Sequence, residues 1–374
     1  MSFLPFSRPH LDEDTIAAVV EVLRSGWITT GPKCLELEAA LSRRCGGRPV
    51  RVVNSATAAL ELALRVAGIG RDDEVIVPSL TWVATANVVL EVGATPRFVD
   101  VAADTRLIDL ALVEDAITSR TRAIMPVDLA GLPVDRDRLY GLAEKHGLRV
   151  IEDAAQSQGA NWHGREIGSF GDLVCFSFHP NKNMTTGEGG CLVMNTDEEA
   201  TLFERLRFQG VIRRADHTYD CDVLGGKSNL TDIAAAIGLG QLKQLDAFNA
   251  KRKALAKAYF ERLDPNRLEL PLEDFEHGNW QMFQVLLPEA MADSRAELID
   301  RMKADGIGIG VHFPAVHLTS LYQQRGCGGL CLPHTESIAR RTMSLPMFPQ
   351  MEIEQVERVA QNLHRHLDQI KSQL

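Results

Sequence analysis

Apolar and polar positions alternate along the first part of the chain in a way that predicts strands and helices in turn. Short runs rich in valine and isoleucine are each followed by a segment with helical spacing. Alternation of this kind is typical of βαβ units, in which a mostly parallel sheet carries helices on both faces. The sequence therefore predicts an α/β fold. The predicted strands are 50–53, 74–77, 97–101, 123–127 and 149–151, and the predicted helices are 12–24, 34–44, 56–66, 83–92, 111–117 and 135–146.

The rest of the chain predicts more helices and fewer strands. A polar stretch without a clear period, residues 209–228, interrupts the pattern, and loops of this length are usually functional or mobile. We divide the chain into a large α/β domain, residues 1–248, and a smaller α+β domain, residues 249–374. Further helices are predicted at 196–208, 233–245, from there to about 263, 294–304 and 353–370, and further strands at 173–178, 191–194, 282–287 and 308–313.

A polar, glycine-rich loop joins the two predicted strands 173–178 and 191–194. Pro180 ends the first strand, because proline has no N–H to give to a sheet. The loop carries a single lysine, Lys182. A lysine held and desolvated between two strand ends is a nucleophile that forms Schiff bases with carbonyl groups. Taken alone, Lys182 is better interpreted as a solvated surface lysine, since a motif needs its structural context.

Composition and charge narrow the function classes. The chain has 374 residues, of which 45% are hydrophobic and 24% charged, as in an ordinary globular protein with a sizeable core. The net charge of −10 disfavours nucleic acid as a partner, because proteins that bind it usually carry a basic face. An anionic small molecule remains compatible with this charge, because local N–H groups can bind it.

Cysteine spacing and hydropathy predict neither a metal site nor a membrane segment. Cys327 and Cys331 form a lone pair without a second pair or a histidine cluster, so we expect a loop there. We expect no targeting segment, and no apolar run is long enough to span a bilayer. The scattered, odd number of cysteines is typical of a reducing compartment, so we expect a cytoplasmic protein.

Candidate chemistry lies where the predicted strands end, which is where ligands bind in such sheets. After Val53, the turn 54–57 is rich in small and hydroxyl residues and opens a helix, an arrangement suited to phosphate. On this tetrapeptide alone, an ordinary Ser/Thr helix cap is the better interpretation. After Val77 comes Trp82, which could stack on a planar ring or cap the core.

The next two strand ends add a carboxylate, an amide and a hydroxyl. Asp153 ends an apolar strand, where a carboxylate needs a cation or a strong donor, and Gln156 follows it. Ser177 lies at the end of the following strand, five residues before Lys182. A phosphate cradle, a stacking ring, a carboxylate, a hydroxyl and a lysine are together the equipment for pyridoxal 5′-phosphate (PLP). The combination is far more specific than any of its members.

Several segments of the chain resemble the DegT/DnrJ-type sugar-nucleotide aminotransferases, a branch of the fold-type I PLP enzymes. Within that family, FLPFSRP, GWITTGPK and SLTWV are most similar to the members that make UDP-4-amino-4-deoxy-L-arabinose for lipid A modification. The resemblance implies a mostly parallel, seven-stranded type of sheet sandwiched by helices. The resembling segments are GWITTGPK (26–33), NSATAAL (54–60), DEVIVPSLTWVATAN (73–87), IEDAAQSQGA (151–160), FSFHPNKNMTTGEGG (176–190), NLTDIAAAIGLGQL (229–242) and SLPMFP (344–349).

The resemblance assigns a role to each residue around the cofactor ring. Lys182 would bond covalently to the cofactor aldehyde and act as general acid and base. Asp153 would pair with the pyridine nitrogen, Gln156 would contact the ring, and Trp82 would stack on it. No metal is implied.

The resemblance also implies how phosphate and substrates are held. The backbone of Ala56 and Thr57, together with Ser177, would hold the phosphate. Asn229 would reach the phosphate of a neighbouring subunit, which implies a homodimer with shared sites. The residues expected to contact substrate are Trp27, Thr29 and His312.

The implied reaction is a ping-pong amino transfer from L-glutamate to a nucleotide-linked keto sugar, expected to be a UDP-4-keto sugar, in lipopolysaccharide or other glycan biosynthesis. Three alternatives differ in class. A dehydratase branch of the family has histidine in place of the lysine, and Lys182 argues against it. A non-catalytic PLP-binding regulator is disfavoured by the acidic charge. An oxidoreductase is disfavoured because neither 187–190 nor 306–310 has the dinucleotide-binding spacing.

Overall fold

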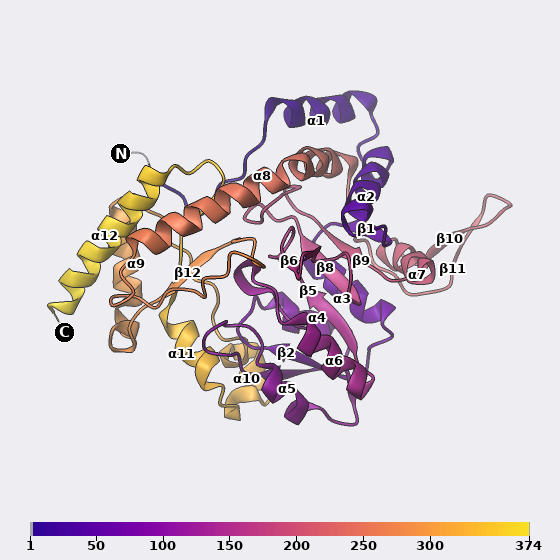
Figure 1. The fold of residues 1–374 in the computed structure, drawn as a ribbon. Coiled ribbons are helices and arrows are strands. Elements are labelled where there is room, and N and C mark those ends of the chain that lie inside the picture. Colours follow the sequence, from indigo (N-terminus) through magenta and orange to yellow (C-terminus); the bar gives the residue numbers. More distant parts are fainter. Residues whose placement is uncertain (1–2, 374) are drawn as a thin grey trace.

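The predicted strands assemble into a seven-stranded sheet in the order β1-β9-β8-β5-β4-β2-β3 (Figure 1). The structure is a computed structural model that describes residues 3–373, so the outer ends of both predicted domains lie outside the described residues. Six strands run parallel, and β9 is antiparallel to its neighbours β1 and β8, which confirms the mostly parallel α/β fold. The strands are β1 (Val50–Val53), β2 (Glu74–Pro78), β3 (Thr95–Val99), β4 (Thr121–Ile124), β5 (Arg149–Asp153), β8 (Leu173–Ser177) and β9 (Gly190–Val193).

Helices cover both faces of this sheet. Strand β8 shows how: Leu173 and Cys175 pack in the cluster under α3, α4 and α7, whereas Val174 and Phe176 pack under α2 on the opposite face. Because successive side chains of a strand point to opposite faces, a strand buried on both sides needs the unbroken apolar run that predicted it. The covering helices are α2 (Pro32–Arg44), α3 (Ala56–Val66), α4 (Ala84–Glu91), α5 (Leu110–Ala116), α6 (Arg136–His146) and α7 (Asp197–Arg207).

The helix α8 (Asp232–Arg262) joins the two halves of the molecule (Figure 1). We predicted two helices here, 233–245 and a second to about 263, but the structure has one helix of 31 residues. Its first part packs against α1 (Glu13–Ser25) and α2, and its last part packs on α12 (Ile353–Lys371). The predicted boundary at residue 248 falls inside α8, and the division into two domains stays a prediction.

The C-terminal part contains one small sheet and its own apolar cluster. Strand β12 (Phe283–Leu286) pairs antiparallel with β13 (Thr342–Leu345), and α9 (Arg295–Ala304) and α11 (Pro333–Arg341) contribute to the apolar clusters that contain these strands. Helix α10 (Ser320–Gln324) instead packs through Tyr322 on the cluster of the large sheet. The predicted strand 308–313 is wrong: its Gly310 forms only an isolated bridge to Ser344 of β13. Gly308 and Gly310 have no side chains that could pack against a neighbouring strand, and glycine inside a strand weakens it. Strand β13, with hydroxyls at alternate positions, was not predicted.

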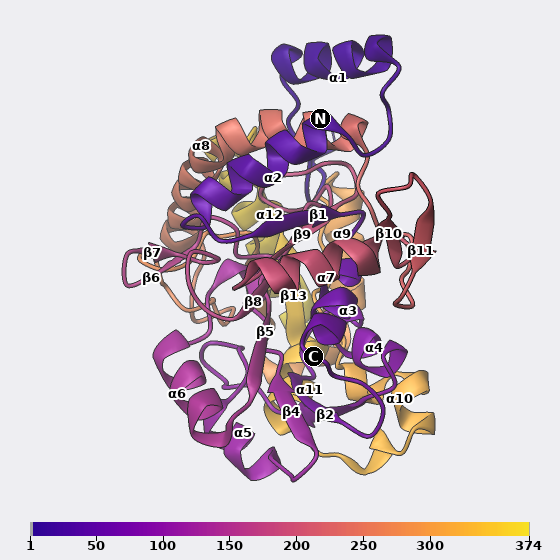
Figure 2. The ribbon, with the colours of Figure 1, turned by 90° about the vertical axis from the view of Figure 1, so that its right-hand side faces the viewer.

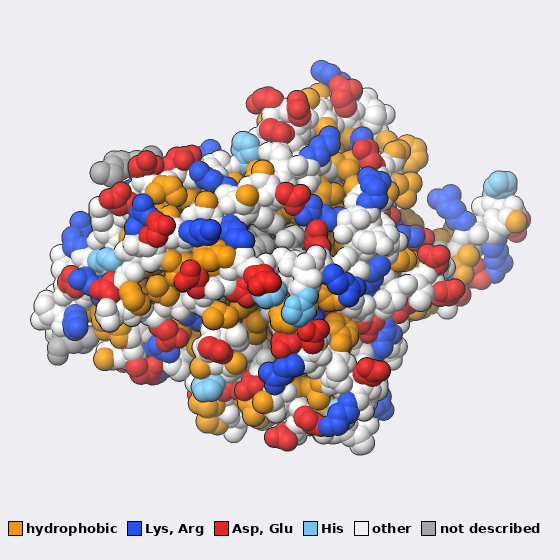
Figure 3. Space-filling model, in the orientation of Figure 1, with side chains coloured by type: hydrophobic (Ala, Val, Ile, Leu, Met, Phe, Trp, Pro, Cys, Tyr) orange, Lys and Arg blue, Asp and Glu red, His pale blue; other side chains and the backbone are white. Residues whose placement is uncertain are grey.

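The polar stretch 209–228 contains a hairpin that the sequence pattern did not predict. Strands β10 (Val211–Arg213) and β11 (Tyr219–Cys221) pair antiparallel and project from the body of the molecule (Figures 1 and 2). In the space-filling view the projecting hairpin carries charged side chains of both signs (Figure 3). A third short pair is formed by β6 (Asn161–Trp162) and β7 (Arg165–Glu166). Across residues 3–373, no helix combines the length and the apolar character needed to cross a membrane.

Candidate active site

A cleft of about 440 Å³ lies at the carboxyl ends of the central strands. Its volume is in the range of small-molecule and cofactor sites. The structure brings together in it residues from the ends of β5 and β8, the start of α3, and the C-terminal part. The predicted site residues that line the cleft are Ala56, Thr57, Trp82, Asp153, Gln156, Ser177, Lys182 and His312.

Asp153 is the last residue of β5 and is only 6% exposed. Its carboxylate accepts a hydrogen bond from the Thr85 hydroxyl at 2.7 Å and another from the backbone N–H of Ala155 at 3.2 Å. Burial raises the pKa of Asp153, while the Thr85 and Ala155 donors and the charge of Lys182 act in the opposite direction. A buried carboxylate at a strand end needs a hydrogen-bond donor. Here a hydroxyl of α4 donates to it, and the positive charge of Lys182 also favours its ionised form.

The Lys182 amine lies among protein atoms on the wall of the same cleft. Burial lowers its pKa from 10.5 to about 8, and the negative charge of Asp153 limits the fall. The side chain is half-buried because it opens onto the cleft. An amine whose pKa lies near neutrality is partly unprotonated at physiological pH, which a nucleophile or a proton acceptor requires.

The other end of the cleft has the form of an anion cradle. The N–H groups of Ala56 and Thr57 are the first two of α3 and have no partner within the helix, while the Ser55 hydroxyl accepts from Ala58 N–H at 3.1 Å. Gly190 of β9 lets the strands approach this turn, since a Cβ there would lie 2.6 Å from the nitrogen of Ala56. The helix start therefore presents free N–H groups to the cleft.

Gln156 and His312 complete the walls. The Gln156 side-chain oxygen accepts from the N–H of Ala130 at 2.7 Å, so its amide group is held with the nitrogen free to donate. His312 pairs through Nδ1 with the Ser344 hydroxyl at 2.9 Å. Burial and the nearby Lys182 charge lower the pKa of His312 to about 4, so its ring is neutral at physiological pH.

Three predicted site residues do not line the cleft of their own chain. Trp27 is 57% exposed, and its ring N–H donates to the carbonyl of Thr30 at 3.1 Å. Asn229 donates to the Thr30 hydroxyl and accepts from Lys227, and Thr29 is exposed beside them. The loop before α2 and the segment before α8 therefore form one surface outside the cleft, and Asn229 forms a bridge with Val53 at the end of β1.

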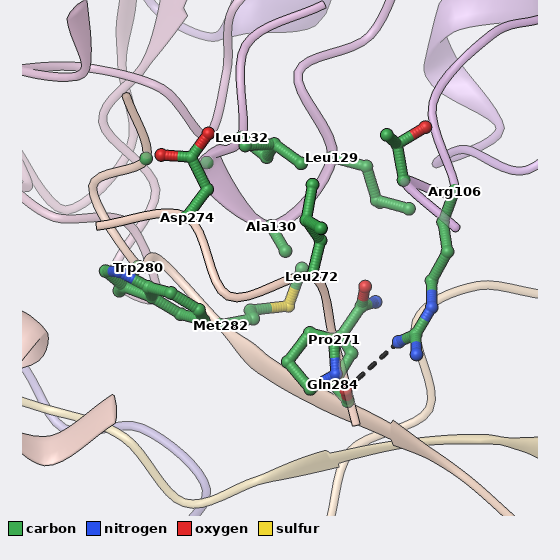
Figure 4. A pocket seen from close by; sticks show the side chains of 13 residues that line it. Arg106, Leu129, Ala130, Leu132, Pro271, Leu272, Asp274, Trp280, Met282 and Gln284 are labelled. Carbon is green, nitrogen blue, oxygen red and sulfur yellow. Dashed lines mark hydrogen bonds between the residues drawn. The ribbon is translucent and has the colours of Figure 1, made fainter. Parts of the chain in front are cut away.

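A second, smaller cavity lies behind the loop that holds Gln156 (Figure 4). Its volume is about 40 Å³, room for one or two water molecules. Figure 4 shows Arg106 on one side, donating to the carbonyl of Gln284 at 3.0 Å, and Trp280 on the other. The cavity is too small for a cofactor or a sugar, so the chemistry belongs to the larger cleft.

Comparison with known proteins agrees with this geometry. The model of the DegT/DnrJ/EryC1/StrS aminotransferase family matches residues 9–364. The chain belongs to this family. Spr1654 from Streptococcus pneumoniae, assigned as a sugar aminotransferase, is 33% identical over 99% of both chains with a TM-score of 0.94, and its structure is known in PLP and pyridoxamine phosphate forms.

Two further solved structures are similar over nearly the whole chain. DesV from S. venezuelae is 37% identical, with 98% of this chain and 99% of the DesV chain covered and a TM-score of 0.90. DesI, solved in the presence of its TDP-sugar product, is 31% identical, with coverage of 98% and 93% and a TM-score of 0.89. The structure of this aminotransferase is thus similar along its whole length to enzymes that act on sugars.

The residues of this aminotransferase fit PLP. The α3 N-terminus offers N–H groups for the phosphate, and Gly190 leaves the turn open. Asp153 and Lys182 offer a carboxylate and an amine with a lowered pKa in one cleft. Ser177 adds a hydroxyl that accepts from the N–H of His179 at 3.3 Å and keeps its own hydrogen to donate.

Sequence reasoning missed several residues of the cleft. Thr81, Glu188 and Phe313 line the cleft. Thr85 lies behind the cleft wall and donates a hydrogen bond to Asp153. Thr81 and Thr85 stand four residues apart around the start of a helix that follows a strand end, which is a signal that could have been used. Phe313 comes from the segment wrongly predicted as a strand, and no sequence pattern indicated that it packs 6.0 Å from the Trp82 ring.

The lowered pKa of Lys182 predicts an unusual reactivity in the cofactor-free aminotransferase. Acylation needs the unprotonated amine, so labelling of Lys182 by acetic anhydride should rise with a midpoint near pH 8. An unperturbed lysine has a pKa of about 10.4. Peptide mass spectrometry over a pH series measures the labelling of Lys182, and a midpoint near that ordinary value of about 10.4 would contradict the account.

Proposed function

We propose that the protein transfers the amino group of L-glutamate to a nucleotide-linked keto sugar by a ping-pong mechanism that depends on PLP. The observation that carries the proposal is the pair formed by Lys182 and Asp153 in one cleft with the α3 N-terminus. When bound there, PLP supplies an aldehyde that accepts the amino group and a ring that stabilises negative charge.

Lys182 is the general base and general acid of the proposed reaction. Its Nζ, with a pKa lowered to about 8, is the one amine that lines the cleft among residues 3–373. With the cofactor bound, Nζ would accept the proton that leaves the α-carbon of the amino donor and would later give it up, and it would move a proton in the opposite direction when the keto sugar is aminated. A single group suits both transfers because its pKa lies near the working pH.

Asp153 and Trp82 orient the cofactor and the substrate. The Asp153 carboxylate favours a protonated pyridine nitrogen, which makes the ring a better electron acceptor. Trp82 is 58% exposed at the cleft mouth, close to Phe313, and offers a flat apolar face for stacking. His312 is neutral, so it can accept or donate a hydrogen bond to a substrate without adding charge.

A homodimer accounts for the residues that lie away from the cleft. The surface formed by Trp27, Thr29 and Asn229 does not line the cleft of its own chain and carries exposed Ile28, with Lys227 beside Asn229. Exposed apolar residues grouped in this way are typical of an interface. We propose that a second copy covers this surface and receives Asn229 at its phosphate cradle, while Trp27 and Thr29 contact its substrate.

The finer substrate proposal is a UDP-4-keto sugar, in lipid A modification or other lipopolysaccharide or glycan biosynthesis in the cytoplasm. It is supported by the segments FLPFSRP (3–9), GWITTGPK (26–33) and SLTWV (79–83). The TDP-sugar product in the DesI structure supports a nucleotide-linked sugar in general. Seven unpaired cysteines suit a reducing compartment.

A panel of acceptors tests this function. The protein is loaded with pyridoxamine phosphate and mixed with UDP-, dTDP- and GDP-linked keto sugars, with pyruvate and 2-oxoglutarate as non-sugar acceptors. We expect an amino sugar by mass spectrometry and return of the PLP absorbance, strongest with a UDP-4-keto sugar. Turnover with the keto acids alone and with none of the sugars would contradict the proposal.

A further inference from the structure

Two threonine hydroxyls form a chain that ends on Asp153. The Thr85 hydroxyl donates to Oδ2 of Asp153 at 2.7 Å, and the hydroxyls of Thr81 and Thr85 are 2.8 Å apart. Thr85 is fully buried and Thr81 is 2% exposed. Thr81 lines the cleft, whereas Thr85 lies behind it, so the chain connects the cleft wall to the carboxylate from the side of α4.

The direction of the chain follows from what each group can donate. An ionised carboxylate only accepts hydrogen bonds, so the single hydrogen of Thr85 points to Asp153. The Thr85 oxygen can then only accept from Thr81, whose hydrogen is therefore committed as well. In such a chain each bond polarises the next, which strengthens the bond to the carboxylate in a buried site.

We propose that Thr85, supported by Thr81, is a positioning residue that keeps the Asp153 carboxylate ionised and fixed in place for the ring nitrogen of the cofactor. This inference rests on the proposed function. Thr85 touches neither the cleft nor a reacting atom and acts through Asp153 alone. The hydroxyl is needed because burial works against the charge that Asp153 must carry.

The other groups around Asp153 do not replace this hydroxyl. Lys182, from the loop after β8, favours the charged form, but its own charge is disfavoured by burial. Asp128, after β4, disfavours the charge on Asp153, and it is itself paired with Arg136 at 2.7 Å. Cys175 on β8 stays a neutral thiol because burial raises its pKa well above the ordinary value. The backbone N–H of Ala155 also donates to Asp153, at 3.2 Å, and the Thr85 hydroxyl of α4 is the neutral side-chain donor beside it, at 2.7 Å.

The test compares substitutions that separate the hydroxyl from the shape of the side chain. Thr85→Val keeps the shape and removes the hydroxyl, and Thr85→Ser keeps the hydroxyl and removes the methyl group. The dissociation constant of PLP is measured by absorbance titration from pH 5 to pH 9 for each variant and for the unmodified protein. A PLP analogue with carbon in place of the ring nitrogen serves as the matched ligand.

We expect PLP affinity to weaken as pH falls and Asp153 becomes protonated. In Thr85→Val this weakening should begin about one pH unit higher, because a lost hydrogen bond to a charged group makes ionisation harder. Thr85→Ser should follow the unmodified protein. Binding of the analogue without the ring nitrogen should differ less than about twofold between Thr85→Val and the unmodified protein, since it does not use the charge of Asp153.

Three results would overturn the inference. They are a Thr85→Val profile that superimposes on that of the unmodified protein, a Thr85→Ser shift as large as that of Thr85→Val, and an equal loss for the analogue. Should Thr85→Val fail to fold, Thr81→Val carries the test, and an unshifted profile there overturns the inference too. Failure of the unmodified protein to bind PLP at all would instead contradict the proposed function.

Discussion

Replacing Lys182 with alanine is expected to lower the rate of amino transfer by about a thousandfold or more, because one group both bonds to the cofactor and moves the proton. No other lysine or arginine lines the cleft among residues 3–373. Steady-state rates with glutamate and the best keto sugar measure the loss. A small amine such as methylamine, added to the Lys182→Ala protein, should restore part of the rate.

The fold should survive this change. Because its folded pKa of about 8 lies below the ordinary 10.5, charged Lys182 is unfavourable in the cofactor-free protein at pH 7. That penalty is full below pH 8 and fades as pH rises toward 10.5, so Lys182→Ala should melt at an equal or higher temperature at pH 7 and lose this advantage at high pH. Lys145→Ala, which removes an exposed ion pair with Glu114, is the matched control and should keep full activity. Wild-type rates in Lys182→Ala would refute the assignment.

Replacing Asp153 with asparagine should lower the rate by about a hundredfold or more, while PLP binds more weakly. Asparagine keeps the shape and can still accept from Thr85, so the loss isolates the negative charge. Burial raises the pKa of Asp153 above 3.8, so its contribution to stability is lost as pH rises through that raised value. At pH 7 the cofactor-free Asp153→Asn protein should therefore be as stable as the unmodified protein, or more so.

Asp137→Asn provides the comparison for this second substitution. Asp137 is exposed and pairs with His163 at 2.9 Å on the outside of the molecule. Its replacement should change neither the rate nor the PLP affinity, because surface ion pairs contribute little. Stopped-flow rates and thermal unfolding, measured in parallel for Asp153→Asn and Asp137→Asn, show whether Asp153 acts in catalysis or in stability. If Asp153→Asn lost stability and kept its rate, Asp153 would be a structural residue.

The sheet could be predicted from the sequence because its strands are buried on both faces. Such strands appear in the sequence as unbroken apolar runs, as in 173–178. The helices between them have apolar residues at every third or fourth position. Residues at strand ends share one edge of a parallel sheet, so Asp153 and Lys182 could be placed in one site before any geometry was known. The positions of both residues on the wall of the cleft follow from this topology.

The elements that were missed depend on contacts distant in sequence or have no clear apolar pattern. Strand β13 is held by pairing with β12, which is far away in sequence, and not by an apolar run. The hairpin β10–β11 pairs locally, but its short strands mix apolar and polar residues without a clear alternation. The hydrogen bond from Thr85 to Asp153 joins α4 to β5, and the four-residue spacing of Thr81 and Thr85 does not reveal this partner on another element. Trp27, Thr29 and Asn229 remain predictions, because one chain by itself gives them no ligand to contact.

The central claim is that the amine of Lys182 bonds to PLP beside Asp153. Purified protein is mixed with PLP, reduced with borohydride, digested and analysed by mass spectrometry. The account predicts that the cofactor mass is attached to the peptide that contains Lys182, and that the attachment is lost in Lys182→Ala. Attachment to another lysine, or none at all in a protein that turns over, would contradict it.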